Sequence, residues 1–315
     1  MIAIELVRTG NRDEFISYCR KHRFDHDESF LSDHDLEAFD PENGEDFGFL
    51  VRTFEGEVRG AAALMFRPEL RAVGKARFRI FHVEAELGEP RLGEAYRELL
   101  AALTPHAAGL DWLYLFLPES AASATSIVRN LGFSIERQAW LLERELGKVP
   151  APSLPPGYTF REALIRGRDG EPGPDAEAWC SIANAAFRDL AGHTELLPSR
   201  LLEENDVSLD FKGSWLLLEE EGRPIGLCAT VRDVENRTDG AFLGPVAVLP
   251  AWQGRGLGRA ALRAGLAAAK EAGCKRCSLS VNAENENAVQ LYIGEDFRKK
   301  YVMVCWHRAP WNPGP

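Results

Sequence analysis

The segment GPVAVLPAWQGRGLGR (residues 244–259) runs from an apolar strand through a glycine-rich loop into a helix. Residues 257–271 are mostly Ala and Leu, the strongest helix formers, and Gly273 is placed to end that helix. Three glycines allow the backbone N–H groups of the loop to converge, and the helix N-terminus adds a partial positive charge. The pattern predicts an anion site suited to a pyrophosphate.

Two common phosphate-binding loops do not fit this segment. The G-x-G-x-x-G spacing of dinucleotide-binding folds is absent, and no Gly-Lys-Ser/Thr follows as in nucleotide P-loops. Taken alone, the loop is equally consistent with a tight turn that binds nothing. A second motif is needed to decide between the two interpretations.

That second motif, NENAVQLY, occupies residues 285–292 and is followed by Asp296-Phe297. Asn285, Ala288 and Tyr292 are spaced i, i+3 and i+7, so they share one face of a predicted helix. Such a face either packs in the core or presents Tyr292 to a ligand. Asn285 either binds that ligand or caps its own helix.

Together the two motifs resemble the GNAT superfamily, the Gcn5-related N-acetyltransferases. Their acetyl-CoA loop reads Gln/Arg-x-x-Gly-x-Gly/Ala after a strand ending V-x-V-x-P, and about forty residues later they carry N-x-x-A-x-x-L-Y and a G-F pair. Residues 246–258 match the first pattern in full, and residues 285–292 match the second.

The resemblance implies acetyl-CoA as co-substrate, no metal, and Tyr292 as the general acid toward the CoA thiolate. The residues implied in acetyl-CoA binding are Val246, Ala247, Val248, Gln253, Gly254, Arg255, Gly256, Leu257, Gly258, Arg259 and Asn285.

One position departs from the family pattern, because Asp296 stands where the family has a glycine. Aspartate tolerates a left-handed backbone better than most residues, so the turn can survive. Otherwise the helix ends at Gly294, and the direction of Tyr292 changes with it.

The two halves of the chain read alike, and a segment with four prolines (Pro150, Pro152, Pro155 and Pro156) separates them. Each half predicts a strand, a helix, a hairpin, a β-α-β unit and closing strands, which is a mixed sheet with a right-handed crossover. We expect an α+β fold of two tandem GNAT-like domains, each a mixed, largely antiparallel sheet flanked by helices. The tandem arrangement resembles that of mycothiol synthase-like acetyltransferases. The expected division is 1–149, a proline-rich linker at 150–157, and 158–315 as the catalytic domain.

The first copy has lost the phosphate pattern. Pro90 stands where Gln or Arg is expected, and Glu86, Glu89 and Glu94 place negative charge where phosphates would lie. The later motif survives as residues 130–133 without a tyrosine at the acid position. We expect this copy to be degenerate and not to bind acetyl-CoA.

The amino-acid composition limits which classes of partner we expect the protein to bind. The chain of 315 residues has a formal net charge of −11, which opposes nucleic acid and favours a small cationic amine. The longest apolar run, residues 61–66, is far short of the ~20 residues of a membrane span. We expect a cytoplasmic monomer or homodimer without a disulfide scaffold, because six cysteines are too few for a chain of this length.

The predicted function is an N-acetyltransferase that moves acetyl from acetyl-CoA to a primary amine by direct attack in a ternary complex. The alternative is a non-catalytic acyl-CoA-binding or interaction protein. No carboxylate lies on residues 241–245, where many relatives carry the base, so Asp239, His193 and Glu195 are candidates and none is assigned. The lone Cys274-x-x-Cys277 pair is read as two small hydrophobic residues, and the seven histidines are too scattered to form a predicted cluster.

A carboxylate-rich stretch without Lys or Arg lies between Asp25 and Asp46 and is read as a solvated surface, or else as an attraction for an amine acceptor. Its members are Asp25, Asp27, Glu28, Asp33, Asp35, Glu37, Asp40, Glu42, Glu45 and Asp46.

Overall fold

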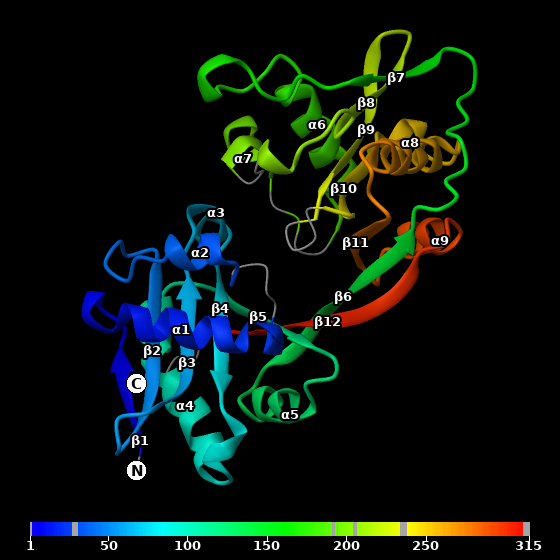
Figure 1. The fold of residues 1–315 in the computed structure, drawn as a ribbon. Helices are drawn as coiled ribbons and strands as arrows, with labels where there is room; N and C mark the ends of the chain where they lie inside the picture. Colours follow the sequence, from blue (N-terminus) through cyan, green and yellow to red (C-terminus); the bar gives the residue numbers. More distant parts are fainter. Residues whose placement is uncertain are drawn as a thin grey trace. The chain divides into compact units, whose positions relative to one another are not determined.

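The computed structural model describes residues 2–26, 31–190, 193, 195–203, 207–233 and 238–310. The chain forms two compact units: unit 1 holds Met1–Ala139 and Tyr301–Pro315, and unit 2 holds Trp140–Lys300 (Figure 1). These limits differ from the expected division at residues 150–157, because the last strand predicted for each half ends in the other unit. The division of the sequence into two copies stays a prediction.

Unit 1 is built on a sheet with the strand order β1-β2-β3-β4-β5-β12. Adjacent strands pair antiparallel except β4 and β5, which are parallel. The strands are β1 (Ile2–Leu6), β2 (Asp46–Thr53), β3 (Val58–Met65), β4 (Lys75–Val83), β5 (Trp112–Pro118) and β12 (Arg298–Arg308), of which unit 1 takes the part from Tyr301. The helices are α1 (Arg12–His22), α2 (Asp33–Glu37), α3 (Pro68–Ala72), α4 (Arg91–Leu103) and α5 (Ala122–Asn130).

Unit 2 repeats this plan with the order β6-β11-β10-β9-β8-β7, in which β10 and β11 are parallel and β7 to β10 pair antiparallel. The strands are β6 (Ser134–Glu145, from Trp140 in this unit), β7 (Tyr158–Glu162), β8 (Trp215–Glu220), β9 (Arg223–Arg232), β10 (Gly240–Val248) and β11 (Arg276–Asn282). The helices are α6 (Ala176–Phe187), α7 (Pro198–Glu203), α8 (Leu257–Glu271) and α9 (Glu286–Ile293). Mixed, mostly antiparallel sheets with helices confirm the predicted fold class.

Small residues allow α8 to lie close to its sheet. The helix buries Leu257, Leu262 and Leu266 together with several alanines. At Gly265 an added Cβ would lie 2.5 Å from Thr230 Oγ1 and 2.6 Å from Cys228 Sγ on β9. The Ala/Leu/Gly composition that predicted this helix therefore also sets how closely it packs.

The two units share one register at their parallel strands. Lys75 pairs with Trp112 in unit 1, and Gly240 pairs with Arg276 in unit 2. In both units the parallel pairing covers three residue pairs, after which β4 and β10 continue without β5 and β11. At this constant offset Val83 corresponds to Val248. In the described part of the chain, no helix is both long and apolar enough to cross a membrane.

Candidate functional site

Strand β10 turns part of its backbone away from its antiparallel neighbour. The N–H of Leu249 donates to Ile225 O (2.8 Å), which makes this a hydrogen-bonded pair of the β9–β10 ladder. Because such pairs alternate, Val246 and Val248 direct their N–H and C=O groups to the opposite side, where β11 no longer pairs. Val248 O accepts a hydrogen bond from Gln253 Nε2 (2.9 Å). The end of β10 thus presents backbone donors beside the glycine-rich loop.

The loop itself keeps its backbone accessible. Gly254 and Gly256 have φ of +76° and +79°, a left-handed conformation that L side chains rarely adopt. A Cβ built on either glycine would meet no atom within 4 Å. Gly256 is also the N-cap of α8 and supplies no side-chain cap, so the first N–H groups of this helix are left for an anion. The predicted anion loop and helix N-terminus are therefore adjacent and exposed.

Arginine side chains around the loop and α8 form structural hydrogen bonds and also supply positive charge. Arg255 donates to the Tyr158 hydroxyl (3.3 Å) and to Ala251 O (3.1 Å). Arg259 lies 3.6 Å from the buried carboxylate of Glu295, to which Arg263 donates two hydrogen bonds of 2.8 and 2.9 Å. The side chain of Arg259 is 49% exposed, which leaves its charge available beside the helix N-terminus.

Asn285 has one of its two expected roles. Its side chain accepts a hydrogen bond from the N–H of Ala288 (3.3 Å), so it caps α9. A further part for Asn285 in acetyl-CoA binding stays a prediction.

Tyr292 lies in the core of unit 2, on the inner face of α9. It is 8% exposed and packs in a cluster with Cys228, Cys277 and Phe297. Burial, with the two cysteines nearby, raises the pKa of the Tyr292 hydroxyl. The hydroxyl therefore stays protonated over the whole physiological range.

Asp296 adopts the left-handed conformation that the family glycine would provide, with φ of 64°. Its N–H donates to Ile293 O (3.1 Å), and the N–H of Phe297 donates to Tyr292 O (3.1 Å). This pair of bonds is a Schellman motif with Asp296 at C′. The turn survives the substitution, as one of the two sequence expectations had it.

Unit 1 differs from unit 2 at the matching backbone donor. The N–H of Val83 donates to the Tyr96 hydroxyl (3.2 Å), so a side chain of α4 occupies the position that faces outward at Val248. A Schellman motif at Gly132 matches that of Asp296 and puts the buried Val128 at the position of Tyr292. These differences support the expectation that the first copy does not bind acetyl-CoA.

One of the three candidate bases, Asp239, lies away from the site. Asp239 forms an ion pair with Arg276 (3.2 Å), and its C=O accepts the N–H of Lys275 (2.7 Å). This places Asp239 at the paired start of β10 and β11, away from the end where they separate. His193 and Glu195 stay candidates, and no base is assigned.

The structure agrees with the expectation for the cysteines and contradicts the expectation for the histidines. All six cysteines are free and buried, in keeping with packing as small hydrophobic residues. The expectation that the histidines form no cluster was wrong, because His22, His26 and His82 lie together in unit 1. His82 is 60 residues from His22 and 56 from His26, and only the pairing of β4 with β3 and the position of α1 bring it close to them.

Comparison with known proteins agrees with this geometry. The family model described as "Acetyltransferase (GNAT) family" matches residues 176–294. A mycothiol acetyltransferase of Thermobispora bispora is 31% identical over 220 residues, which cover 67% of this chain and 70% of that protein.

The chain belongs to the GNAT acetyltransferase family.

A second relative of this GNAT chain, a mycothiol acetyltransferase of Frankia alni, is 35% identical over 225 residues, or 66% of this chain and 63% of that protein. Among solved structures, a GCN5-related N-acetyltransferase from Sphaerobacter thermophilus aligns with TM-score 0.70 and 21% identity over 100% of this chain and 97% of that one. A tandem GNAT protein from the clavulanic acid biosynthesis pathway aligns with TM-score 0.68 and 15% identity over the whole of both chains. At these identities the two structures show the fold, including its tandem arrangement.

Proposed function

We propose that this chain transfers an acetyl group from acetyl-CoA to a primary amine of a small, cationic acceptor. The observation that carries the proposal is the arrangement at the end of β10. Outward-facing backbone groups of Val246 and Val248 lie directly before an exposed glycine loop and the N-terminus of α8. One molecule with an amide-rich arm and a pyrophosphate can bind both, and acetyl-CoA is such a molecule.

The glycine-rich loop suits the phosphates of acetyl-CoA, and the end of β10 suits its amide-rich arm. Open space beside Gly254 and Gly256 lets phosphate oxygens approach their backbone, and the helix N-terminus favours the negative charge. By resemblance to the family, the N–H groups of Val246 and Val248 would bind pantetheine and polarise the thioester carbonyl. Ala247 completes this strand end, and Arg259 adds positive charge at the loop.

The reaction we propose is direct attack of the amine on the thioester carbonyl while both substrates are bound. Collapse of the tetrahedral intermediate breaks the C–S bond and releases CoA as a thiolate. Tyr292 gives its phenolic proton to that sulfur, whose conjugate acid has a pKa of about 8.5. The nitrogen of the former amine gives up a proton to water as the amide forms, and the phenolate takes a proton back from water. Because burial raises the pKa of Tyr292, the phenol is present in its proton-bearing form before each turnover.

Two observations support a small acceptor. The net charge of −11 favours a cationic amine over nucleic acid, and the relatives above are named for acetylation of a small molecule. The carboxylate-rich stretch between Asp25 and Asp46 gives only weak support to a cationic acceptor. Asp33 pairs with Arg20 and Asp46 with Arg79, while Asp27 and Glu28 lie outside the described residues.

Incubation of the protein with acetyl-CoA and a panel of primary amines, followed by detection of free CoA thiol, tests the proposal. We expect amine-dependent thiol release with at least one small cationic amine. Acetyl-CoA binding without turnover on any amine would instead support a non-catalytic acyl-CoA-binding protein. The absence of a carboxylate on residues 241–245 is the observation that favours this second function.

A further inference from the structure

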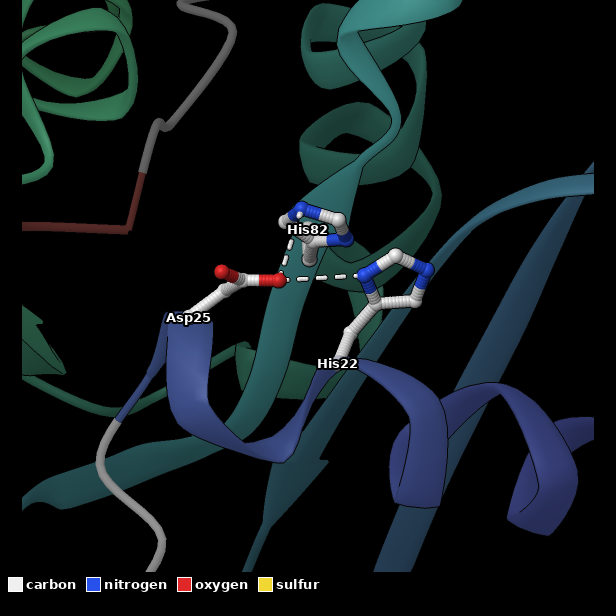
Figure 2. Close-up of side chains that lie close together, drawn as sticks. All are labelled: His22, Asp25 and His82. Carbon is white, nitrogen blue, oxygen red and sulfur yellow. Dashed lines mark hydrogen bonds and ion pairs between the residues drawn. The ribbon is translucent and has the colours of Figure 1, made fainter.

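Three side chains that can bind a metal ion converge in unit 1. His22 is the last residue of α1, Asp25 lies in the 3-10 turn Arg23–Asp25 that follows, and His82 is on β4 (Figure 2). Asp25 Oδ2 lies 3.0 Å from His22 Nδ1 and 3.8 Å from His82 Nε2. The three potential ligand atoms all lie within 4.8 Å of one another.

The outer nitrogen of each imidazole is already hydrogen-bonded. His22 lies between two carboxylates, with Nε2 3.0 Å from Glu84 Oε1 and Nδ1 3.0 Å from Asp25 Oδ2. The Tyr18 hydroxyl donates to Arg59 O (3.3 Å), so it accepts from His82 Nδ1 (2.8 Å). With its proton on Nδ1, His82 directs the lone pair of Nε2 inward, toward the carboxylate of Asp25.

His22 Nδ1, Asp25 Oδ2 and His82 Nε2 face one another, and a positive charge between them would satisfy all three. One proton shared by His22 and Asp25 would satisfy two of the groups, because 3.8 Å is too long for a hydrogen bond to His82. A metal ion bonded to all three would satisfy each.

The surroundings have the form of a second coordination shell. Metal-binding histidines commonly donate their other N–H to a carboxylate or another fixed acceptor, as His22 does to Glu84 and His82 to Tyr18. Glu84 is buried and is held in turn by Lys21 (2.5 Å) and Arg59 (2.9 Å). The groups around the histidines thus have their hydrogen-bond partners, whereas the space between the three potential ligand atoms is left for an ion.

A cavity and a further histidine adjoin these ligands. Asp25 and His82 line a cavity of about 440 Å³, which also contacts Tyr96 on α4 and Ser120 after β5. His26 is 5% exposed, its ring lies edge-on to that of His82 with centroids 5.6 Å apart, and among the described residues its Nε2 has no hydrogen-bond partner.

We propose that His22, Asp25 and His82 bind a divalent transition-metal ion, Zn²⁺, with its fourth position open to this cavity. Two imidazoles and one carboxylate with an open position form a common zinc site. This proposal departs from the expectation that the protein uses no metal. In unit 2 the positions of His82 and Glu84 correspond to Ala247 and Leu249, so the fold itself does not require the cluster.

Zn²⁺ titration of the untagged full-length chain, after removal of metal by a chelator, tests the site. We expect one Zn²⁺ per chain, measured by competition with a chromophoric chelator, and intense visible absorption when Co²⁺ replaces it. His82→Gln and Asp25→Asn should each weaken Zn²⁺ binding at least 100-fold. His106→Gln is the matched control, because His106 stacks on Phe47 in the same unit and is not part of the cluster.

Tyr18→Phe keeps the ring and removes the hydroxyl, and with it the outer hydrogen bond to His82 and the longer one to Arg59 O (3.3 Å), so it tests the site even where a ligand variant fails to fold. We expect a 10–100-fold loss of affinity with an unchanged circular dichroism spectrum. A wild-type chain that binds no stoichiometric Zn²⁺, or binding that survives His82→Gln in folded protein, would overturn the proposal. The cluster would then be a hydrogen-bonded His22–Asp25 pair only.

Discussion

The backbone N–H of Phe297 donates to the carbonyl of Tyr292 (3.1 Å), and their rings meet at 66° with centroids 5.7 Å apart. This combination of a hydrogen bond and an apolar contact is typical of a Schellman motif, in which residues C″ and C3 pack together. The turn after α9 therefore also fixes the ring of Tyr292. Unit 1 repeats the same bond between Phe133 and Val128 (3.1 Å).

The matched turns predict opposite effects of two substitutions on stability. Asp296→Gly should raise the free energy of unfolding by about 1 kcal/mol, because glycine adopts φ of 64° without the cost that a side chain brings. Gly132→Asp, at φ of 84° in unit 1, should lower it by a similar amount. Both positions are exposed, so only the backbone is tested. Urea denaturation measures both, and a destabilised Asp296→Gly would contradict this account of the turn.

Tyr292→Phe tests the general acid. The substitution keeps the ring and its contact with Phe297 and removes only the hydroxyl. Because a thiolate is already a fair leaving group, we expect kcat to fall on the order of 10²-fold, with KM for acetyl-CoA within a few-fold and Tm unchanged. Tyr96→Phe in unit 1 is the control and should leave kcat as it is. A kcat within about twofold of wild type in folded Tyr292→Phe would make Tyr292 a core residue only.

The pKa of Tyr292 also predicts the form of the pH profile. A general acid works while it holds its proton, and burial raises the pKa of this phenol above its ordinary value of about 10. As pH rises from 7 to 10, kcat should therefore show no decline that depends on Tyr292. Saturating assays across this range measure the effect. A descending limb with an apparent pKa below 10 that is absent from Tyr292→Phe would show that the phenol is not shifted upward.

Local sequence patterns predicted the glycine-rich loop and the start of α8 because these parts are local. Residues 246–258 contain the strand end, the loop and the first turn of α8, so their spacing alone places them together. The left-handed conformation of Asp296 was one of two expectations and rested on the tolerance of aspartate for that backbone. The tertiary surroundings of Tyr292, which raise its pKa, depend on β9 and β11 and could not be derived from the helix spacing.

The histidine cluster shows why other features could not be predicted. His22 and His82 are sixty residues apart, and their approach depends on how α1 lies on the sheet. The course of β12, which begins in unit 2 and ends in unit 1, could not be predicted for a similar reason. The sequence predicts closing strands in each half, but the pairing of β12 with β5 depends on long-range contacts that no local pattern reports.

The most direct test of the central claim, that acetyl-CoA binds unit 2 alone, is isothermal titration of acetyl-CoA with two matched variants. Gly258 and Gly93 occupy corresponding positions in the first turns of α8 and α4, and an added Cβ meets no atom closer than 3.8 Å at either. We predict one site per chain in the wild type, at least a tenfold loss of affinity in Gly258→Glu, where a carboxylate opposes the phosphates, and no change in Gly93→Glu. Two sites in the wild type, or weaker binding in Gly93→Glu with Gly258→Glu unaffected, would contradict it.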